Sequence, residues 1–214
     1  MASIQSLKAG IVIGSTRVTR IGPQIASFVR DAIQSPLARN STNATQSQIQ
    51  IDIIDIKDFN LPMFDEPGIP NRFISSEDYS NEHTRAWSRH ISKFDAFVFL
   101  TSERNWGIPA ELKNAIDYLF HEWKGKPAMI VSYGGQGGVH SAEQVKIVAG
   151  AIGMRVVDGM INMSFPSREF VGKGLAGESL GLDATDQNAP WSEHVPEISS
   201  IFWDHLVKEM LVSK

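Results

Sequence analysis

Short apolar segments alternate along the chain with longer segments in which apolar residues recur at helical spacing. Strands are expected at residues 7–13, 50–56, 96–101, 128–132 and 155–157. Helices are expected at residues 21–33, 81–93, 109–120, 139–151 and 191–212. The first and third strands are apolar almost throughout, which is typical of a parallel sheet covered on both faces. This alternation predicts an α/β fold with a doubly wound five-stranded parallel sheet, as one domain over residues 1–214.

Three segments interrupt this pattern. Residues 35–48 are rich in Ser, Thr, Asn and Gln and are expected to form an exposed loop. Residues 62–81 contain three prolines and one glycine, which predicts a long irregular connection. Residues 164–190 are glycine-rich with little apolar periodicity, so an irregular arm is expected there, before the C-terminal helix.

The loop after the first strand, residues 14–22, has the composition of an anion-binding site. Hydroxyl groups and two arginines precede a helix whose first N–H groups are free to bind an anion. The loop matches neither a Walker A motif nor the G-x-G-x-x-G fingerprint, so it suits one terminal phosphate better than a pyrophosphate. The candidate phosphate ligands are Ser15, Thr16, Arg17, Arg20 and Ile21.

The loops after the third and fourth strands are expected at the same edge of the sheet, where doubly wound folds bind ligands. Residues 134–138 contain four glycines, which let backbone N–H groups approach a flat ligand closely. Together with the first loop, they predict a site for a mononucleotide with a large planar head. The candidate residues around that head are Ser102, Glu103, Arg104, Asn105, Trp106, Ser132, Tyr133, Gly134, Gly135 and Gln136.

The composition of the chain argues against several classes of function. The net charge of −4 argues against nucleic acid as the main partner. The chain has no cysteine, which excludes thiolate metal sites and a cysteine nucleophile, so redox chemistry would need a bound cofactor. The histidines are scattered, and no metal site is expected. No apolar run approaches the roughly 18 residues of a membrane span, and no secretory leader is recognised, so a cytoplasmic protein is expected.

The ordered motifs resemble the NADPH-dependent FMN reductases of the flavodoxin-like fold, in particular the soluble fungal quinone and azo-dye reductases. Residues 14–17 match the G-S-x-R phosphate loop of that family, and residues 105–117 match its N-x-x-x-P-A-x-L-K-N-A-I-D signature. Residues 121–127 and 132–135 complete a resemblance over about residues 8–160. It implies FMN bound at a dimer interface, in a homodimer or a tetramer. Electrons would come from NADPH or NADH and pass in pairs to quinones, azo compounds or free flavin.

The resemblance implies no catalytic side chain, because the hydride chemistry belongs to the flavin. Gly134, Gly135 and Gln136 would donate toward the N1/O2 edge of its ring. At the second loop the family reads T-P-E/Q-Y-N, whereas this chain has Ser102 for the proline and Arg104 for the aromatic residue. Arg104 over the ring edge would raise the flavin potential; the alternative is that it points to solvent or to a partner subunit.

Three functions are compatible with these motifs. The preferred one is an FMN-dependent NAD(P)H oxidoreductase with a ping-pong mechanism. The second is a flavin-sensing interaction protein that recruits a partner through residues 164–190 and turns over only incidentally. The third is a protein that takes free FMN as a substrate. His140, which follows the glycine loop, is either a proton donor to a reduced quinone or an exposed helix residue.

Overall fold

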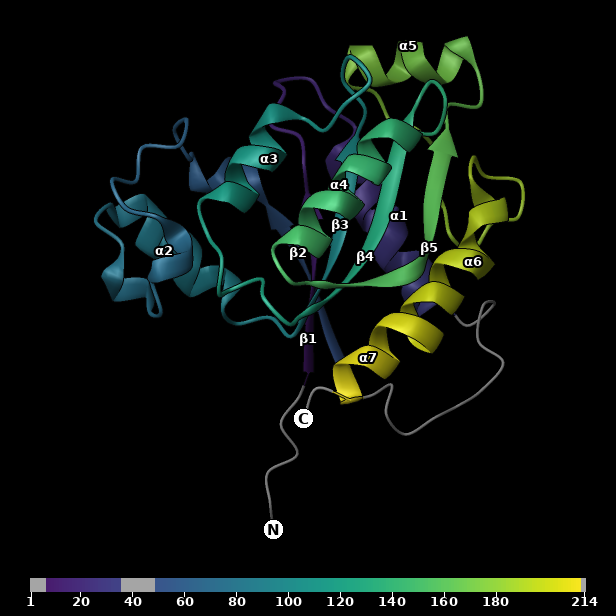
Figure 1. The fold of residues 1–214 in the computed structure, drawn as a ribbon. Helices are drawn as coiled ribbons and strands as arrows, with labels where there is room; N and C mark the ends of the chain where they lie inside the picture. The colour runs from purple at the N-terminus through teal and green to yellow at the C-terminus, as the bar shows by residue number, and fades with distance from the viewer. Residues whose placement is uncertain (1–6, 36–48, 213–214) are drawn as a thin grey trace.

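The computed structural model describes residues 7–35 and 49–212, and its centre is one five-stranded parallel sheet (Figure 1). The strand order is β2-β1-β3-β4-β5, which is the flavodoxin-like order. The strands are β1 (Leu7–Ile13), β2 (Ile49–Asp55), β3 (Ala96–Ser102), β4 (Pro127–Gly134) and β5 (Arg155–Ser164). The expected fold class is confirmed, and its topological switch point lies between β1 and β3.

Helices cover both faces of the sheet. On one face, α1 (Gly22–Gln34) and the C-terminal helices pack against side chains such as Ile11 and Val98. On the other face, α2 (Glu82–Ile91), α3 (Ala110–Asp117) and α4 (Val139–Ala151) pack against Val12 and Phe97. Successive strand residues point to opposite faces, so a strand that is apolar throughout contributes to both cores.

The fifth strand is longer than the sequence predicts. It runs from Arg155 to Ser164, whereas the apolar pattern indicates only residues 155–157. β5 lies at the edge of the sheet, and its residues Asp158 and Gly159 are exposed. A half-exposed edge strand loses the continuous apolar signal of the central strands, which explains the early end of the prediction.

The expectation of an irregular arm at residues 164–190 is wrong for part of that segment. Residues Arg168–Ala176 form helix α5. The Ser167 hydroxyl caps the helix by accepting a hydrogen bond from Phe170 N at 3.1 Å, and the helix ends at Gly177, whose φ is 74°. A serine before the helix and a glycine after it are ordinary boundary signals that the low apolar content obscured.

The C-terminal helix is also less regular than expected. It consists of a short 3-10 turn (Ser192–His194), α6 (Val195–Ser200), a π-helical turn (Ile201–Leu206) and α7 (Val207–Val212). The connection expected at residues 62–81 contains the 3-10 turns η4 (Pro70–Arg72) and η5 (Ser76–Asp78). Most of the loop expected at residues 35–48 lies outside the described residues.

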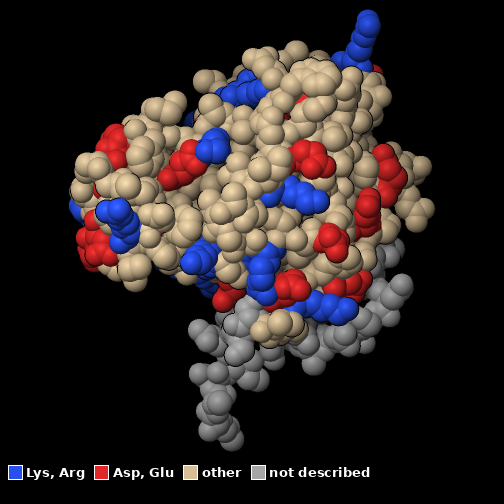
Figure 2. All heavy atoms as spheres, viewed as in Figure 1, with Lys and Arg blue, Asp and Glu red and all other residues tan. Residues whose placement is uncertain are grey.

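Two further features bear on the function. No helix in the described part of the chain is long and apolar enough to cross a bilayer. On the face drawn in Figure 2, acidic and basic side chains are interspersed rather than gathered by sign. This face of the molecule is therefore not continuously basic.

Candidate functional site

A cavity of about 270 Å³ lies beyond the carboxyl ends of β1, β3 and β4. These strands are adjacent in the sheet, and Gly14 N donates to Leu100 O at 2.9 Å, which ties the first loop to β3. Ten of the fifteen sequence-predicted site residues line this cavity: Ser15, Arg17, Arg20, Ile21, Ser102, Glu103, Arg104, Tyr133, Gly134 and Gly135. The three loops therefore meet, as the parallel topology predicts.

The first loop presents an anion-binding face to the cavity. Ser15 is buried, and Arg17 is exposed and forms no ion pair within residues 7–35 and 49–212. Helix α1 begins after Ile21 with no side-chain cap and no acidic residue in its first turn. Its first N–H groups and the Arg17 guanidinium can therefore interact with an anion in the cavity.

Arg20 also lines the cavity, but its charge is already paired. Its guanidinium forms a two-pronged ion pair with Asp55, with Nη1 2.8 Å from Oδ1 and Nη2 on Oδ2, and Nη1 donates to Ser15 O at 2.6 Å. The hydrogen bond with Asp55 raises the pKa of Arg20. Arg20 thus holds the loop backbone in place. Asp55 is the last residue of β2, the strand that pairs with β1. Its place at the end of that strand is all that the sequence offers to predict its ion pair with Arg20.

Thr16 and Arg104 both contact Glu111, in the first turn of α3. Thr16 N donates to Glu111 Oε1 at 3.1 Å, and Thr16 lines a separate cavity of about 260 Å³. Arg104 Nη1 lies 2.9 Å from Glu111 Oε2 and Nη2 lies 2.7 Å from Oε1, while Nη2 also donates to Ser15 Oγ at 3.0 Å. The Arg104 guanidinium therefore lies against the first loop. A phosphate role for Thr16 stays a prediction.

The rest of the second loop turns sharply beside the cavity. Arg104 and Gly107 exchange two backbone hydrogen bonds of 3.0 Å, and Asn105 and Trp106 have positive φ values of 47° and 64°. Trp106 is 65% exposed, and its ring lies 4.0 Å from that of His140. Asn105 and Trp106 are outside the cavity lining, so their predicted contacts with a planar head remain untested.

A buried side chain, Ser132, holds the third loop: its Oγ donates to Gly137 O at 2.6 Å. A Cβ on Gly138 would lie 2.9 Å from Tyr133 O, so that position requires glycine. Gly135 lines the cavity, and a Cβ there would meet no atom within 4 Å. Burial raises the pKa of Tyr133 to about 12, so its phenol stays protonated. Gln136 is exposed and lies outside the lining.

Helix α5 and the residues before it form a wall of the cavity that the sequence analysis missed. Phe165, Phe170, Val171 and Leu175 contribute apolar side chains to the lining. Gly174 lies close to the first loop, because a Cβ there would be 2.9 Å from Ile21 Cγ2. The cavity thus has a cationic side at the first loop and an apolar side at α5.

This lining fits FMN, the group that the motifs indicate. The first loop supplies an unpaired cation and helix N–H groups for a phosphate, and the open glycine loop and apolar wall suit a flat ring. Arg104 Nε is buried and has no hydrogen-bond partner among the described residues. Within those residues, no group of three or more His, Asp or Glu could hold a metal ion.

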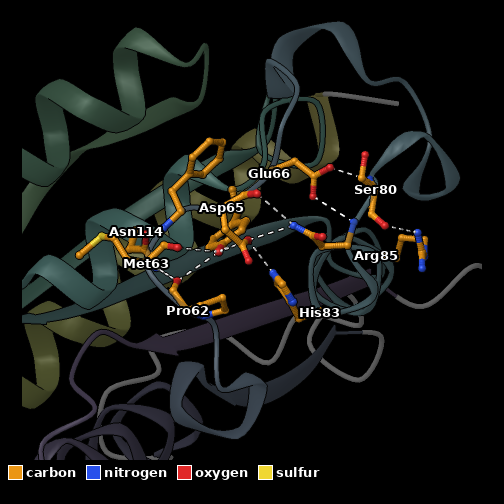
Figure 3. Close-up of polar contacts among 11 residues, drawn as sticks. Pro62, Met63, Asp65, Glu66, Ser80, His83, Arg85 and Asn114 are labelled. Carbon is orange, nitrogen blue, oxygen red and sulfur yellow. Dashed lines mark hydrogen bonds and ion pairs between the residues drawn. The ribbon is translucent and has the colours of Figure 1, made fainter.

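A second polar cluster lies apart from this cavity, in the connection between β2 and α2 (Figure 3). Asp65 accepts hydrogen bonds from His83 Nε2 and Tyr118 OH, both at 2.9 Å. Glu66 accepts from Ser80 N at 2.5 Å, and Asn114 Nδ2 donates to Pro62 O at 2.7 Å. These contacts tie the connection to α2 and α3, and none of the seven residues lines the 270 Å³ cavity.

The fold is shared with solved flavoenzymes. The NAD(P)H:(acceptor) oxidoreductase FerB from Paracoccus denitrificans superposes with a TM-score of 0.61 at 19% identity, over 95% of this chain and 98% of that one. At that level of identity the likeness supports the flavodoxin-like fold alone.

Sequence comparison identifies relatives. The NAD(P)H-dependent FMN reductase LOT6 of Saccharomyces cerevisiae is 40% identical over 156 residues, covering 72% of this chain and 79% of the relative. A protein of Pseudomonas putida named a quinone reductase is 29% identical over 142 residues, covering 60% of this chain and 70% of the relative. The sequence model of the NADPH-dependent FMN reductase family matches residues 7–165. The chain therefore belongs to the NADPH-dependent FMN reductase family, enzymes whose cofactor is FMN and whose electron donor is NAD(P)H.

Proposed function

We propose that the protein holds FMN in the 270 Å³ cavity and passes two electrons from NAD(P)H to quinones, azo compounds or free flavin by a ping-pong mechanism. The observation that carries this proposal is the meeting of three loops at the switch point of the sheet. There, Ser15 and Arg17 line the same cavity as Gly134 and Gly135. A phosphate site and an open glycine loop in one cavity suit a mononucleotide with a planar head.

The phosphate of FMN is assigned to the Ser15 hydroxyl, the Arg17 guanidinium and the first N–H groups of α1. Each charge-assisted hydrogen bond contributes roughly 1.5–3 kcal/mol, and the helix terminus adds about 0.3–1 kcal/mol. Arg20, paired with Asp55, positions the loop. Several such contacts are sufficient to hold the cofactor without a covalent bond.

The ring of FMN is assigned to the second and third loops. Backbone N–H groups of residues 134–136 would face the ring edge that gains negative charge on reduction, and donors there favour the reduced form. When bound, FMN supplies hydride transfer. The chain contributes binding, orientation and, through the apolar wall of α5, exclusion of water from one side of the cavity.

The acceptor class is supported by relatives. The Pseudomonas putida relative is named a quinone reductase, and quinones are flat apolar acceptors that suit an apolar wall. In a ping-pong mechanism the nicotinamide leaves before the acceptor binds. The two molecules would therefore be able to use the same open side of the flavin ring in turn. NADPH and NADH both remain candidate donors, and a cytoplasmic location stays a prediction.

The proposed experiment combines binding and turnover. The purified chain is incubated with FMN, desalted and reduced with NADPH without oxygen; retained flavin absorption that bleaches and returns on addition of a quinone is the expected result. Initial rates at several fixed quinone concentrations should give parallel double-reciprocal plots. A protein that retains no FMN, or intersecting plots, would contradict the proposed resident cofactor or the ping-pong mechanism, respectively.

The alternative of a flavin-sensing interaction protein depends on residues 164–190 as a recruiting arm. Helix α5 of that segment lines the cavity, which favours a role in the site itself. A quinone reduction rate no higher than that of free FMN would favour the sensing function instead.

We further propose that the protein is a homodimer. The proposal comes from the family resemblance, and Ile147 on α4 and Trp106, which are 68% and 65% exposed, are candidate contact residues. Light scattering coupled to gel filtration tests this proposal: a mass of one chain would contradict it, and a mass of four chains would indicate the tetramer.

A further inference from the structure

We infer that Arg104 and Glu111 form a clamp that holds the phosphate-binding loop in shape, and that this clamp sets the preference of the site for FMN over riboflavin. The inference rests on the proposed function, because it assumes that the first loop binds the FMN phosphate. Arg104 is then a positioning residue for the phosphate end of the cofactor, and its side chain does not tune the ring.

Arg104 contacts both Glu111 and the first loop. Both terminal nitrogens face the Glu111 carboxylate, at 2.9 Å for Nη1 to Oε2 and 2.7 Å for Nη2 to Oε1. This is the two-pronged geometry in which arginine binds a carboxylate most strongly. The second hydrogen of Nη2 is directed to Ser15 Oγ at 3.0 Å. Arg104 therefore joins the loop after β3, helix α3 and the loop after β1.

Glu111 completes the clamp from the other side. Its Oε1 also accepts from Thr16 N at 3.1 Å, so one carboxylate holds two consecutive positions of the first loop, Thr16 directly and Ser15 through Arg104. Glu111 lies in the first turn of α3, where the helix dipole favours a negative charge. Its side chain is 19% exposed and that of Arg104 is 32% exposed, so water screens the pair only in part.

The clamp orients the Ser15 hydroxyl. A guanidinium can only donate, so Ser15 Oγ accepts from Arg104, and its own hydrogen is left to donate elsewhere. Ser15 lines the cavity, where the phosphate is the proposed acceptor. The clamp adds no net charge, because Glu111 neutralises Arg104 just as Asp55 neutralises Arg20. The phosphate charge is met by Arg17, which forms no ion pair in the described part of the chain.

The sequence is consistent with a paired substitution. Arg104 replaces the aromatic residue of the family pattern, and Glu111 occupies the variable position of the P-A-x-L-K-N signature. Because only 32% of the Arg104 side chain is exposed, its partly desolvated charge is favoured by a nearby carboxylate. Glu111 supplies it seven positions later in the chain.

The test measures dissociation constants of FMN and riboflavin by quenching of flavin fluorescence on the full-length chain freed of flavin. Arg104→Ala and Glu111→Gln should each weaken FMN binding roughly tenfold or more, the effect of losing one charge-assisted contact. Riboflavin binding should change by less than about threefold, because riboflavin lacks the phosphate. The double variant should be no weaker than Arg104→Ala within about twofold, as expected for residues that act as a unit.

Two further variants complete the design. Arg89→Ala is the matched control, because Arg89 on α2 forms ion pairs with Glu77 in η5 and Glu82 on α2, away from the cavity. The FMN affinity of this variant should be unchanged. Arg104→Lys keeps the charge but lacks the two-pronged geometry, so it should also lower the preference for FMN. Thermal denaturation without flavin shows whether Arg104→Ala folds. If it does not fold, the two dissociation constants are measured on Arg104→Lys instead.

Each of the following outcomes would overturn the inference. Tighter FMN binding by Glu111→Gln would make Arg104 a direct phosphate ligand that Glu111 restrains. Equal weakening of FMN and riboflavin by Arg104→Ala would place Arg104 at the ring, as would a changed midpoint potential with an unchanged preference. If the wild-type chain binds neither flavin, the proposed function fails; if it binds FMN and reduces quinones while the variants keep the wild-type preference, only the clamp is refuted.

Discussion

Glu103 and His140 are joined by two hydrogen bonds at the edge of the cavity. Glu103 Oε2 accepts from His140 N at 3.0 Å and lies 3.1 Å from His140 Nδ1. A carboxylate can only accept, so Nδ1 carries the proton in this pair. Glu103 lines the cavity and His140 does not, so the imidazole acts on the site by holding this carboxylate. Both alternatives for His140, a proton donor to a reduced quinone and an exposed helix residue, stay predictions.

Replacement of His140 by alanine should weaken FMN binding. The Glu103 carboxylate would keep only its backbone partner and could turn toward the cavity, where its charge repels the phosphate. We expect a loss of about threefold, typical of a partly screened charge interaction, measured by fluorescence titration. Adding Glu103→Gln to this variant removes the charge and should restore the wild-type affinity; a double variant as weak as His140→Ala would contradict this explanation.

The ion pair between Arg20 and Asp55 should contribute to stability. Asp55→Asn leaves the Arg20 guanidinium, whose side chain is 11% exposed, without its counter-charge. We expect a loss of about 1–3 kcal/mol in the free energy of unfolding, measured with urea. Asp31→Asn is the matched control, since Asp31 pairs with Arg30 at 52% exposure and should cost less than about 0.5 kcal/mol. Equal effects of the two substitutions would contradict a special role for Asp55.

Lys126 should make stability depend on pH in the alkaline range. Burial lowers the pKa of Lys126 from 10.5 to about 8. The folded state thus disfavours the charged amine, and this cost is fully present below about pH 8 and disappears above about pH 10.5. Lys126→Met should therefore be more stable than wild type by about 1–2 kcal/mol at pH 7, after allowance for partial exposure. The difference should shrink by pH 10; a difference independent of pH would contradict the cause.

Asp65 should contribute to stability on the acid side. Desolvation alone would raise the pKa of Asp65, but hydrogen bonds from His83 and Tyr118 outweigh it and lower the pKa below 3.8. A lowered carboxyl pKa stabilises the fold above the unfolded value, and this contribution is lost as pH falls through the folded value. Asp65→Asn should therefore lower the melting temperature at pH 7 and should differ less from wild type at a pH below 3.8. Asp117→Asn, in an exposed pair with Lys113, should have little effect at either pH.

The sequence predicts the strands, most helices and the topology of this protein well, but it predicts the polar contacts poorly. The bounds of β1 and α4 agree with prediction, because continuous or helically spaced apolar residues report burial directly. The meeting of the three loops follows from parallel topology. The partners of Arg20 and Arg104 could not be predicted, because Asp55 and Glu111 lie on other elements and carry no local signal. Helix α5 was missed because few of its residues face a core.

The most direct test of the whole account is the FMN and riboflavin affinity of Arg17→Ala beside the wild-type chain. We predict that the wild-type protein binds FMN much more tightly than riboflavin. The substitution should remove most of that preference, roughly tenfold or more in FMN affinity, with riboflavin affinity nearly unchanged. An Arg17→Ala protein that binds FMN as tightly as wild type would show that the phosphate does not lie at the first loop, and the assignment of the cavity would be wrong.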